Sequence, residues 1–166
     1  MKDRLAPVFL VGFMGAGKTT VGRALARLLG WEFVDLDDRI VEASGRSIPE
    51  IFAGRGEAHF RELEAEILAD LRGRTRIVVA CGGGTYAHDR SRALIDAIGR
   101  AVWLHAPLAQ ALARCENGPA RPMLRDAAHA EALYAARLPA YRAAPLRVDI
   151  EGLGQEEVAE RIADLL

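Results

Sequence analysis

Lysine is almost absent from this chain of 166 residues, although basic residues in general are not. Only Lys2 and Lys18 are lysines among the 22 basic residues, and all the others are arginines. The 23 acidic residues leave a formal net charge of −1, which argues against a nucleic-acid binder that depends on bulk positive charge. Because Lys18 lies in the most glycine-rich stretch of the chain, that stretch is the first candidate for a specific function.

Cysteines and long apolar segments are also scarce. Cys81 and Cys115 are far apart and neither has a Cys-x-x-Cys partner, so no disulfide framework or zinc site is expected. We expect both to be buried, in a reducing cytoplasm. No apolar run approaches the roughly 20 residues of a membrane span, and no small-residue cleavage pattern follows the apolar run that ends at Gly12. The sequence thus predicts a cytoplasmic protein that contacts no membrane.

Short apolar runs alternate regularly with longer amphipathic stretches. The length predicts a single domain over residues 1–166, since domains commonly contain about 150 residues. Strands are expected at 7–11, 32–35, 77–80, 101–105 and 146–150, and helices at 18–29, 37–43, 57–71, 90–98, 108–115, 127–141 and 155–166, with another helix beginning after Ser47. This order predicts a three-layer α/β fold, a five-stranded parallel sheet with helices on both faces. Ligands of such sheets bind beyond the carboxyl ends of the strands.

Residues 12–19, GFMGAGKT, fit the phosphate-loop pattern G-x-x-x-x-G-K-[ST] between a strand and a helix. Glycines allow successive backbone N–H groups to surround phosphate oxygens, and the helix N-terminus adds the positive end of its dipole. Lys18 can reach the β- and γ-phosphate oxygens, and the Thr19 hydroxyl can bind Mg²⁺. The motif predicts a nucleoside triphosphate site and leaves the phosphoryl acceptor open. An ordinary glycine-rich turn is the alternative.

Two aspartates, Asp35 and Asp37, follow the second expected strand. In an extended chain, residues two apart point the same way, so both carboxylates can face one space. One could hold Mg²⁺ through water, and the other could orient an acceptor hydroxyl or accept its proton. The alternative is that Asp37 only caps the helix that follows.

Arg61 lies four residues after Glu57 and three before Glu64. The spacing favours two surface ion pairs worth a few tenths of a kcal/mol. The alternative is an arginine that these carboxylates hold ready for an anionic substrate. A second arginine, Arg137, could pair with a carboxylate through two hydrogen bonds.

Glycines and arginines mark two further segments. The run 82–84 follows the third strand and is explained either by a ligand close to the backbone or by a tight turn. Arg114, Arg121 and Arg125 flank a loop that contains Gly118, Pro119 and Pro122. Such a basic loop predicts a mobile lid, at about 116–127, that closes over a nucleotide. A solvated charged loop is the alternative.

In this order the motifs resemble the shikimate kinase family, phosphate-loop kinases similar to the nucleoside monophosphate kinases. The segments that carry the resemblance are GFMGAGKTTVGRALARLLG at 12–30, FVDLDDRI at 33–40, IPEIFAGRGEAHFRELE at 48–64, ACGGGT at 80–85 and RPML at 121–124. Arg137 and Tyr141 fit the family's late R-x-x-x-Y element. The resemblance covers nearly the whole chain and places a substrate-binding segment at about 33–64.

The resemblance implies ATP-dependent phosphorylation of the 3-hydroxyl of shikimate, with release of ADP, in the synthesis of chorismate and the aromatic amino acids. Together with the phosphate-loop motif it implies three groups of site residues. They are a nucleotide site of Gly15, Ala16, Gly17, Lys18, Thr19, Thr20, Arg114 and Arg121, a shikimate site of Asp37, Arg61, Gly83, Gly84 and Arg137, and a Mg²⁺ site of Thr19 and Asp35. Catalysis is implied for Asp37, which orients the hydroxyl, and for Lys18 and Arg121, which stabilise the developing charge.

Two other functions remain as alternatives. One is a phosphate-loop kinase for another small polyol acid, such as gluconate, which Arg61, Arg137 and the acidic motif disfavour. The other is a non-catalytic nucleotide-binding module, which Asp35, Asp37 and Arg121 disfavour. A monomer is expected, because no helix shows a second apolar stripe.

Overall fold

The computed structural model describes residues 3–116 and 127–166, except for the side chains of residues 114–116. Its strands are β1 (Val8–Val11), β2 (Glu32–Asp35), β3 (Ile77–Ala80), β4 (Arg100–His105) and β5 (Leu146–Asp149). Its helices are α1 (Lys18–Leu29), α2 (Leu36–Ser44), α3 (Ile48–Asp70), α4 (Asp89–Ile98), α5 (Leu108–Glu116), α6 (Ala127–Arg142) and α7 (Gln155–Leu165). The order of these elements agrees with the order expected from the sequence.

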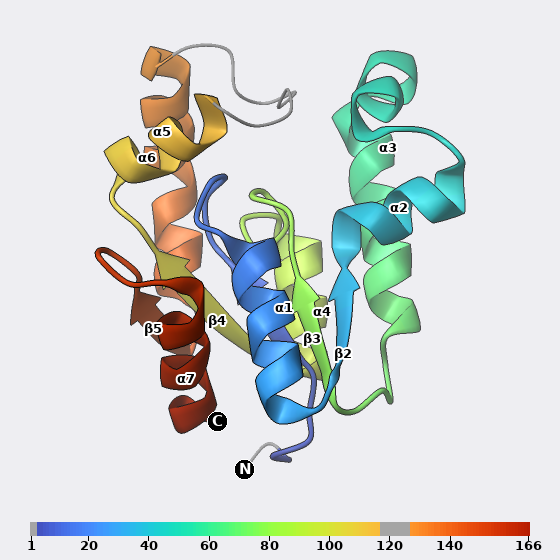
Figure 1. Cartoon of the computed structure of the whole chain (residues 1–166). Helices are drawn as coiled ribbons and strands as arrows, with labels where there is room; N and C mark the ends of the chain where they lie inside the picture. Colours follow the sequence, from blue (N-terminus) through green and yellow to red (C-terminus); the bar gives the residue numbers. More distant parts are fainter. Residues whose placement is uncertain (1–2, 117–126) are drawn as a thin grey trace.

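The five strands form one sheet in the order β2-β3-β1-β4-β5, and every neighbouring pair is parallel (Figure 1). The predicted five-stranded parallel sheet is therefore confirmed. In the register, Ala80 of β3 lies level with Leu10 of β1 and with Asp35 of β2. The segments that follow these three strands consequently emerge together at one edge of the sheet, as the carboxyl-end rule requires.

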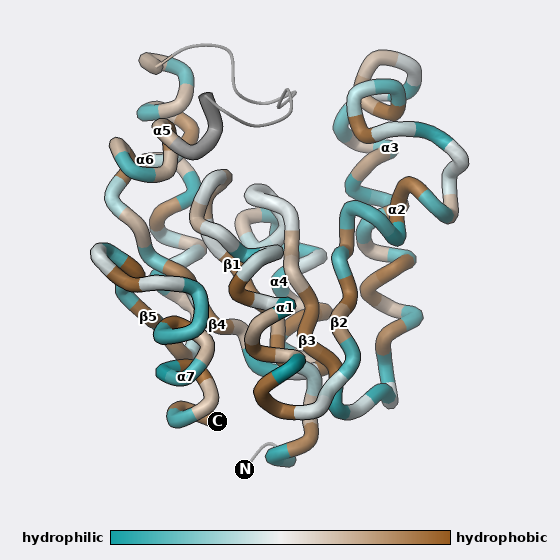
Figure 2. Tube along the Cα trace, in the orientation of Figure 1, coloured by the Kyte–Doolittle hydropathy of each residue, from teal (hydrophilic) through white to brown (hydrophobic). Residues whose placement is uncertain are grey.

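Alternate residues of the strands face opposite layers of helices. In β1, Phe9 and Val11 belong to the core cluster that also includes residues of α3, α4 and α6. Val8 and Leu10 belong to the second cluster, with residues of α1 and α7. Figure 2 shows the most hydrophobic residues along the strands at the centre, between helices that carry hydrophilic residues outward. Period-two alternation thus buries both faces of the sheet.

Helix ends follow the capping signals in the sequence. Gly30 ends α1 in the left-handed conformation, with φ 67°, and the hydroxyl of Ser47 accepts a hydrogen bond from the backbone N–H of Glu50 at the start of α3. The two helices expected at 48–71 both lie within α3, which bends at Gly56, where φ 79° and ψ 177° are not helical. Pro139 does not end α6, which continues to Arg142.

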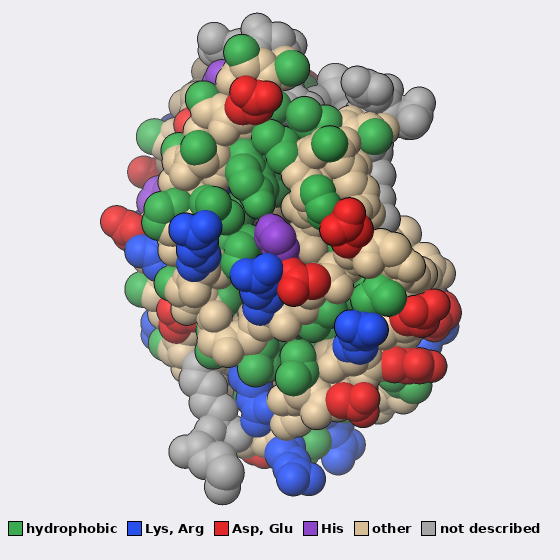
Figure 3. Space-filling model, turned by 90° about the vertical axis from the view of Figure 1, so that its left-hand side faces the viewer, with side chains coloured by type: hydrophobic (Ala, Val, Ile, Leu, Met, Phe, Trp, Pro, Cys, Tyr) green, Lys and Arg blue, Asp and Glu red, His purple; other side chains and the backbone are tan. Residues whose placement is uncertain are grey.

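The face of the molecule in Figure 3 carries both basic and acidic side chains. Hydrophobic side chains gather in the upper half of this face, and the described basic and acidic ones lie mainly across its middle and lower part without a broad patch of one sign. Within the described part of the chain, no helix combines the length and the apolar character needed to cross a bilayer.

Candidate active site

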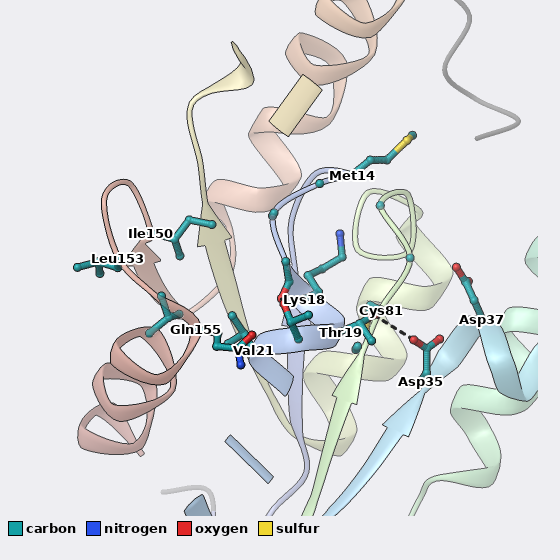
Figure 4. Close-up of a pocket in the computed structure, with 18 of the residues that line it drawn as sticks. Met14, Lys18, Thr19, Val21, Asp35, Asp37, Cys81, Ile150, Leu153 and Gln155 are labelled. Carbon is teal, nitrogen blue, oxygen red and sulfur yellow. Dashed lines mark hydrogen bonds between the residues drawn. The ribbon is translucent and has the colours of Figure 1, made fainter. Parts of the chain in front are cut away.

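A cavity of about 470 Å³ opens at the carboxyl ends of β1, β2 and β3 and reaches the start of α7. Figure 4 shows Lys18, Thr19, Asp35 and Asp37 around it. All six phosphate-loop residues predicted from the sequence line the cavity: Gly15, Ala16, Gly17, Lys18, Thr19 and Thr20. The loop and the acidic pair therefore share one space, as the sequence predicted.

The phosphate loop turns through left-handed glycines and ends at the first residue of α1. Gly15 has φ 77° and Gly17, the N-cap of α1, has φ 85°. No side chain caps the helix, so its N-terminal N–H groups face the cavity without a capping carboxylate or hydroxyl. The buried ammonium of Lys18 donates to the carbonyl oxygens of Gly12 at 2.6 Å and Phe13 at 2.9 Å. The loop thus gathers positive charge around a space for an anion.

Asp35 connects the loop to the second strand. Its Oδ2 accepts from the Thr19 hydroxyl at 3.1 Å, drawn as the dashed line in Figure 4, and its Oδ1 accepts from the backbone N–H of Asp38 at 3.1 Å. Asp35 is therefore the N-cap of α2, and the interpretation of Asp37 as this cap is wrong. The cap lies two residues before Asp37 because α2 begins directly after β2.

Asp37 reaches the cavity from the first turn of α2 rather than from an extended chain. The prediction that both carboxylates face one space is confirmed, since both line the cavity. The argument from an extended chain is wrong, because the helix already begins at Leu36. Asp37 lies against the glycine run: a Cβ atom on Gly82 would stand 3.2 Å from its Oδ1.

Arg61 is buried in the wall beside this site, with only 8% of its surface exposed. Its Nη1 donates at 2.8 Å to Oε1 of Glu64, which is completely buried, and its Nη2 lies 3.5 Å from Oε1 of Glu57. Glu64 also accepts from the hydroxyls of Thr85 at 2.8 Å and Ser91 at 3.0 Å. The interpretation of Arg61 and Glu64 as a surface ion pair is therefore wrong.

Arg137 of α6 meets Arg61 at Gly84. A Cβ atom on Gly84 would stand 2.3 Å from Nη2 of Arg61 and 2.8 Å from Nη2 of Arg137. Burial lowers the pKa of Arg137, and the nearby charge of Arg61 acts in the same direction against the opposing effect of Tyr141. Nη1 of Arg137 is buried, and no atom of the described residues accepts a hydrogen bond from it. Two cations, one of them with an unsatisfied donor, make this a place where a carboxylate would be stabilised.

The glycine run forms a tight turn, as one of the two interpretations predicted, because the backbone N–H of Thr85 donates to the Gly82 carbonyl oxygen at 3.2 Å. Lack of space around it, rather than a left-handed backbone, explains why its residues are glycines. None of Gly82, Gly83 and Gly84 has a positive φ. A Cβ atom on Gly83 would stand 3.1 Å from Cγ of Met14 and 3.2 Å from Nη1 of Arg137, and the hydroxyl of Tyr141 donates to the Gly83 carbonyl oxygen. Burial raises the pKa of Tyr141 to about 12, so the phenol remains a donor. Side chains from three segments thus pack directly on this backbone.

Sequence reasoning missed the wall formed by the segment after β5. Ile150, Leu153, Gly154 and Gln155 line the cavity opposite the acidic pair. Their position in the sequence could have indicated them, because they follow the carboxyl end of a parallel strand. Cys81 also lines the cavity and is buried, as predicted. Burial raises the pKa of its thiol.

The predicted lid lies almost wholly outside the described residues. This applies to Arg121 and Arg125, while Arg114 and Cys115 belong to α5 without a described side chain. The described residues contain no group of three or more His, Cys, Asp or Glu side chains that could hold a metal ion.

Known proteins resemble this chain in both sequence and fold. The model of the family described as shikimate kinase matches residues 14–166. A shikimate kinase of Geobacter sulfurreducens is 47% identical over 94% of this chain and 88% of its own length, and one of Synechococcus elongatus is 41% identical over 96% and 85%. Among solved structures, a shikimate kinase from Acinetobacter baumannii in complex with shikimate has a TM-score of 0.90 and 37% identity over 98% of this chain and 93% of that one. A sugar kinase from Janibacter, with a TM-score of 0.68 and 18% identity, shares the fold.

Proposed function

The chain belongs to the shikimate kinase family, and from this membership we propose that it transfers the γ-phosphoryl group of ATP to the 3-hydroxyl of shikimate. ADP and shikimate 3-phosphate are the products, on the route to chorismate and the aromatic amino acids. One observation carries the proposal beyond family membership. A phosphate loop, an aspartate and two buried arginines that converge on Gly84 lie along one edge of the sheet. A kinase for a hydroxylated carboxylic acid needs these three kinds of group together.

The nucleotide would bind with its phosphates in the loop of residues 15–20. Lys18 would exchange the carbonyl oxygens of Gly12 and Phe13 for phosphate oxygens, since an ammonium on a flexible stem can reach either. The apolar side chains of Ile150 and Leu153 would flank the base at the other side of the cavity. Arg114 and Arg121 are proposed, from the family pattern alone, near the adenine and over the phosphates.

Mg²⁺ fits the donors that lie at the floor of the cavity. Thr19 supplies a hydroxyl and Asp35 a carboxylate, and their oxygens are 3.1 Å apart. Few protein ligands are expected for this ion, because Mg²⁺ in kinases usually takes one or two protein oxygens together with water and substrate phosphates. When bound there, the ion would neutralise charge on the β- and γ-phosphates.

The acceptor would bind between the acidic and the basic side of the site. Arg61 and Arg137 would hold its carboxylate, with Gly83 and Gly84 leaving the necessary space. Asp37 would accept a hydrogen bond from the reacting hydroxyl, orient it toward the γ-phosphate and take its proton. Lys18 and Arg121 would stabilise the charge that develops during transfer.

We further propose that residues 1–166 act as one unit and as a monomer in the cytoplasm, where ATP is available and a buried thiol such as Cys81 stays reduced. Light scattering at increasing protein concentration tests the monomer. A constant mass of about one chain is expected, and a concentration-dependent rise would contradict it.

A coupled assay of ADP release tests the function. We expect release to depend on both ATP and shikimate, and to be lost without added Mg²⁺. Activity with gluconate or another polyol acid in place of shikimate would favour the first alternative. Nucleotide binding without turnover of any acid would favour a non-catalytic module.

A further inference from the structure

We propose that Glu57 competes with the substrate carboxylate for Arg61, so that it sets the affinity and selectivity of the acceptor site. The proposal rests on the proposed function, in which Arg61 and Arg137 hold the carboxylate of the acceptor. It concerns a residue on the rim of that site rather than one of its proposed ligands.

The two terminal nitrogens of Arg61 have different partners. Nη1 is bound at 2.8 Å to Glu64, which is fully buried and tied to two further hydroxyl groups. Nη2 is the nitrogen that lies at Gly84 beside Nη2 of Arg137. A substrate carboxylate between the two arginines must therefore use Nη2 of Arg61. The carboxylate of Glu57 lies 3.5 Å from this same atom.

Glu57 is held much less firmly than Glu64. Half of its side chain is exposed, and its ion pair with Arg61 is 0.7 Å longer than the pair with Glu64, from 3.5 Å against 2.8 Å. It directly follows Gly56, where α3 bends and where an added Cβ atom would meet nothing within 4 Å. The backbone at this bend is thus loosely surrounded, and the Glu57 side chain can move into solvent at small cost.

The charges explain why Glu57 and a substrate carboxylate exclude each other. Arg61 and Arg137 carry two positive charges, and the buried Glu64 balances one of them. Glu57 faces the remaining positive charge. Its own charge also acts on Arg137 by raising the pKa of that guanidinium. A second carboxylate at Nη2 would repel Glu57, so an acid must displace it. A neutral ligand gains no ion pair in return, and the site thereby selects for acids.

The test is Glu57→Gln, which removes the charge and keeps the size of the side chain. We expect the KM for shikimate to fall about two- to five-fold, the range that loss of one half-exposed ion pair allows, with kcat and the KM for ATP unchanged. Glu62→Gln is the matched control on the same helix. The Glu62 side chain is 66% exposed, and its Oε2 lies 3.8 Å from Nδ1 of His59. The KM of the Glu62→Gln variant for shikimate should equal that of the natural chain.

A rise in the KM for shikimate in Glu57→Gln would overturn the proposal, because Glu57 would then support Arg61 instead of competing for it. An equal fall in both variants would also overturn it, since the effect would be one of overall charge.

A second measurement separates this inference from the proposed function. The melting temperature is recorded in sodium acetate and in sodium chloride at equal ionic strength, and acetate should stabilise Glu57→Gln more than Glu62→Gln. If shikimate is not phosphorylated but acetate acts selectively, the proposed function fails and the competition stands. Equal effects of acetate on both variants would refute the competition.

Discussion

At the scale of single residues, the site depends on side-chain size as much as on charge. Lys18 is one of two lysines in a chain with 22 basic residues, and it is the one that reaches inside the phosphate loop. Its ammonium donates to two carbonyl oxygens at 2.6 Å and 2.9 Å, as a compact charge on a flexible stem can, whereas a guanidinium holds its donors in a rigid planar fork. Arginine serves elsewhere in the site, at Arg61 and Arg137, where a flat group packs against glycine backbone.

Asp37 is predicted to matter for turnover rather than for nucleotide binding. Asp37→Asn should lower kcat with shikimate by about 10²–10⁴-fold, because the acceptor hydroxyl loses its base and orienting acceptor. ATP binding, measured by calorimetry, should stay unchanged, since the phosphate loop is untouched. Asp38→Asn is the control, an exposed carboxylate in the same turn of α2 whose contact with Asp35 is made by its backbone N–H. Near-normal turnover in Asp37→Asn would remove Asp37 from catalysis.

Gly84 is predicted to tolerate no side chain. In Gly84→Ala, the new Cβ atom would stand 2.3 Å from Nη2 of Arg61, so both arginines must move. We expect the KM for shikimate to rise at least about tenfold, the effect of losing one good charge-assisted hydrogen bond, with little change in the KM for ATP. Gly54→Ala serves as the control, because its Cβ atom would make ordinary contact at 3.5 Å with Arg46. A KM for shikimate unchanged in Gly84→Ala would mean that the arginines do not bind the acceptor.

At the scale of elements, local signals in the sequence located most helices and strands. Glycine at the end of α1, serine at the start of α3 and the apolar runs of the strands act within a few residues, so the sequence alone reveals them. The environment of Arg61 could not be inferred in this way. Spacing predicts that Arg61 and Glu64 meet, but only the packing of α3 against the segment after β3 and against α4 brings Thr85 and Ser91 to Glu64.

The buried cluster around Glu64 is predicted to stabilise the packing of α3 on α4. Glu64→Ala removes the buried carboxylate that pairs with Nη1 of Arg61 and that accepts from the hydroxyls of Thr85 and Ser91. We expect the free energy of unfolding to fall by about 3–5 kcal/mol, measured by urea denaturation. The exposed Glu62 provides the control, and Glu62→Ala should cost no more than about 0.5 kcal/mol. A loss of less than about 1 kcal/mol in Glu64→Ala would show that the cluster adds little to stability.

At the scale of the whole molecule, the strand order decides which distant segments share the site. Because β1 is central, the loop after it lies between the segment after β3 on one side and the segment after β5, which leads into α7, on the other. The sequence predicted the edge of the sheet at which the motifs meet. It did not identify residues 150–155, because the two glycines and one glutamate of this short segment match no known binding motif. Only the sheet order assigns it to the cavity.

A ligand that spans this cavity is predicted to stabilise the whole fold, since the cavity walls come from the phosphate loop, β2, β3, α1, α2 and α7. ATP with Mg²⁺ at a hundred times its Kd should add about 2.7 kcal/mol to the free energy of unfolding and raise the melting temperature by about 5–10 °C. Lys18→Met should lose most of this shift, because the phosphates lose their buried cation. Arg27→Met should keep it, since Arg27 lies on the same helix but pairs with Glu156 at the surface, where its side chain is 64% exposed. The melting temperatures are measured by scanning calorimetry. Equal shifts in both variants would mean that the nucleotide binds without Lys18 and that the phosphate loop is not its anchor.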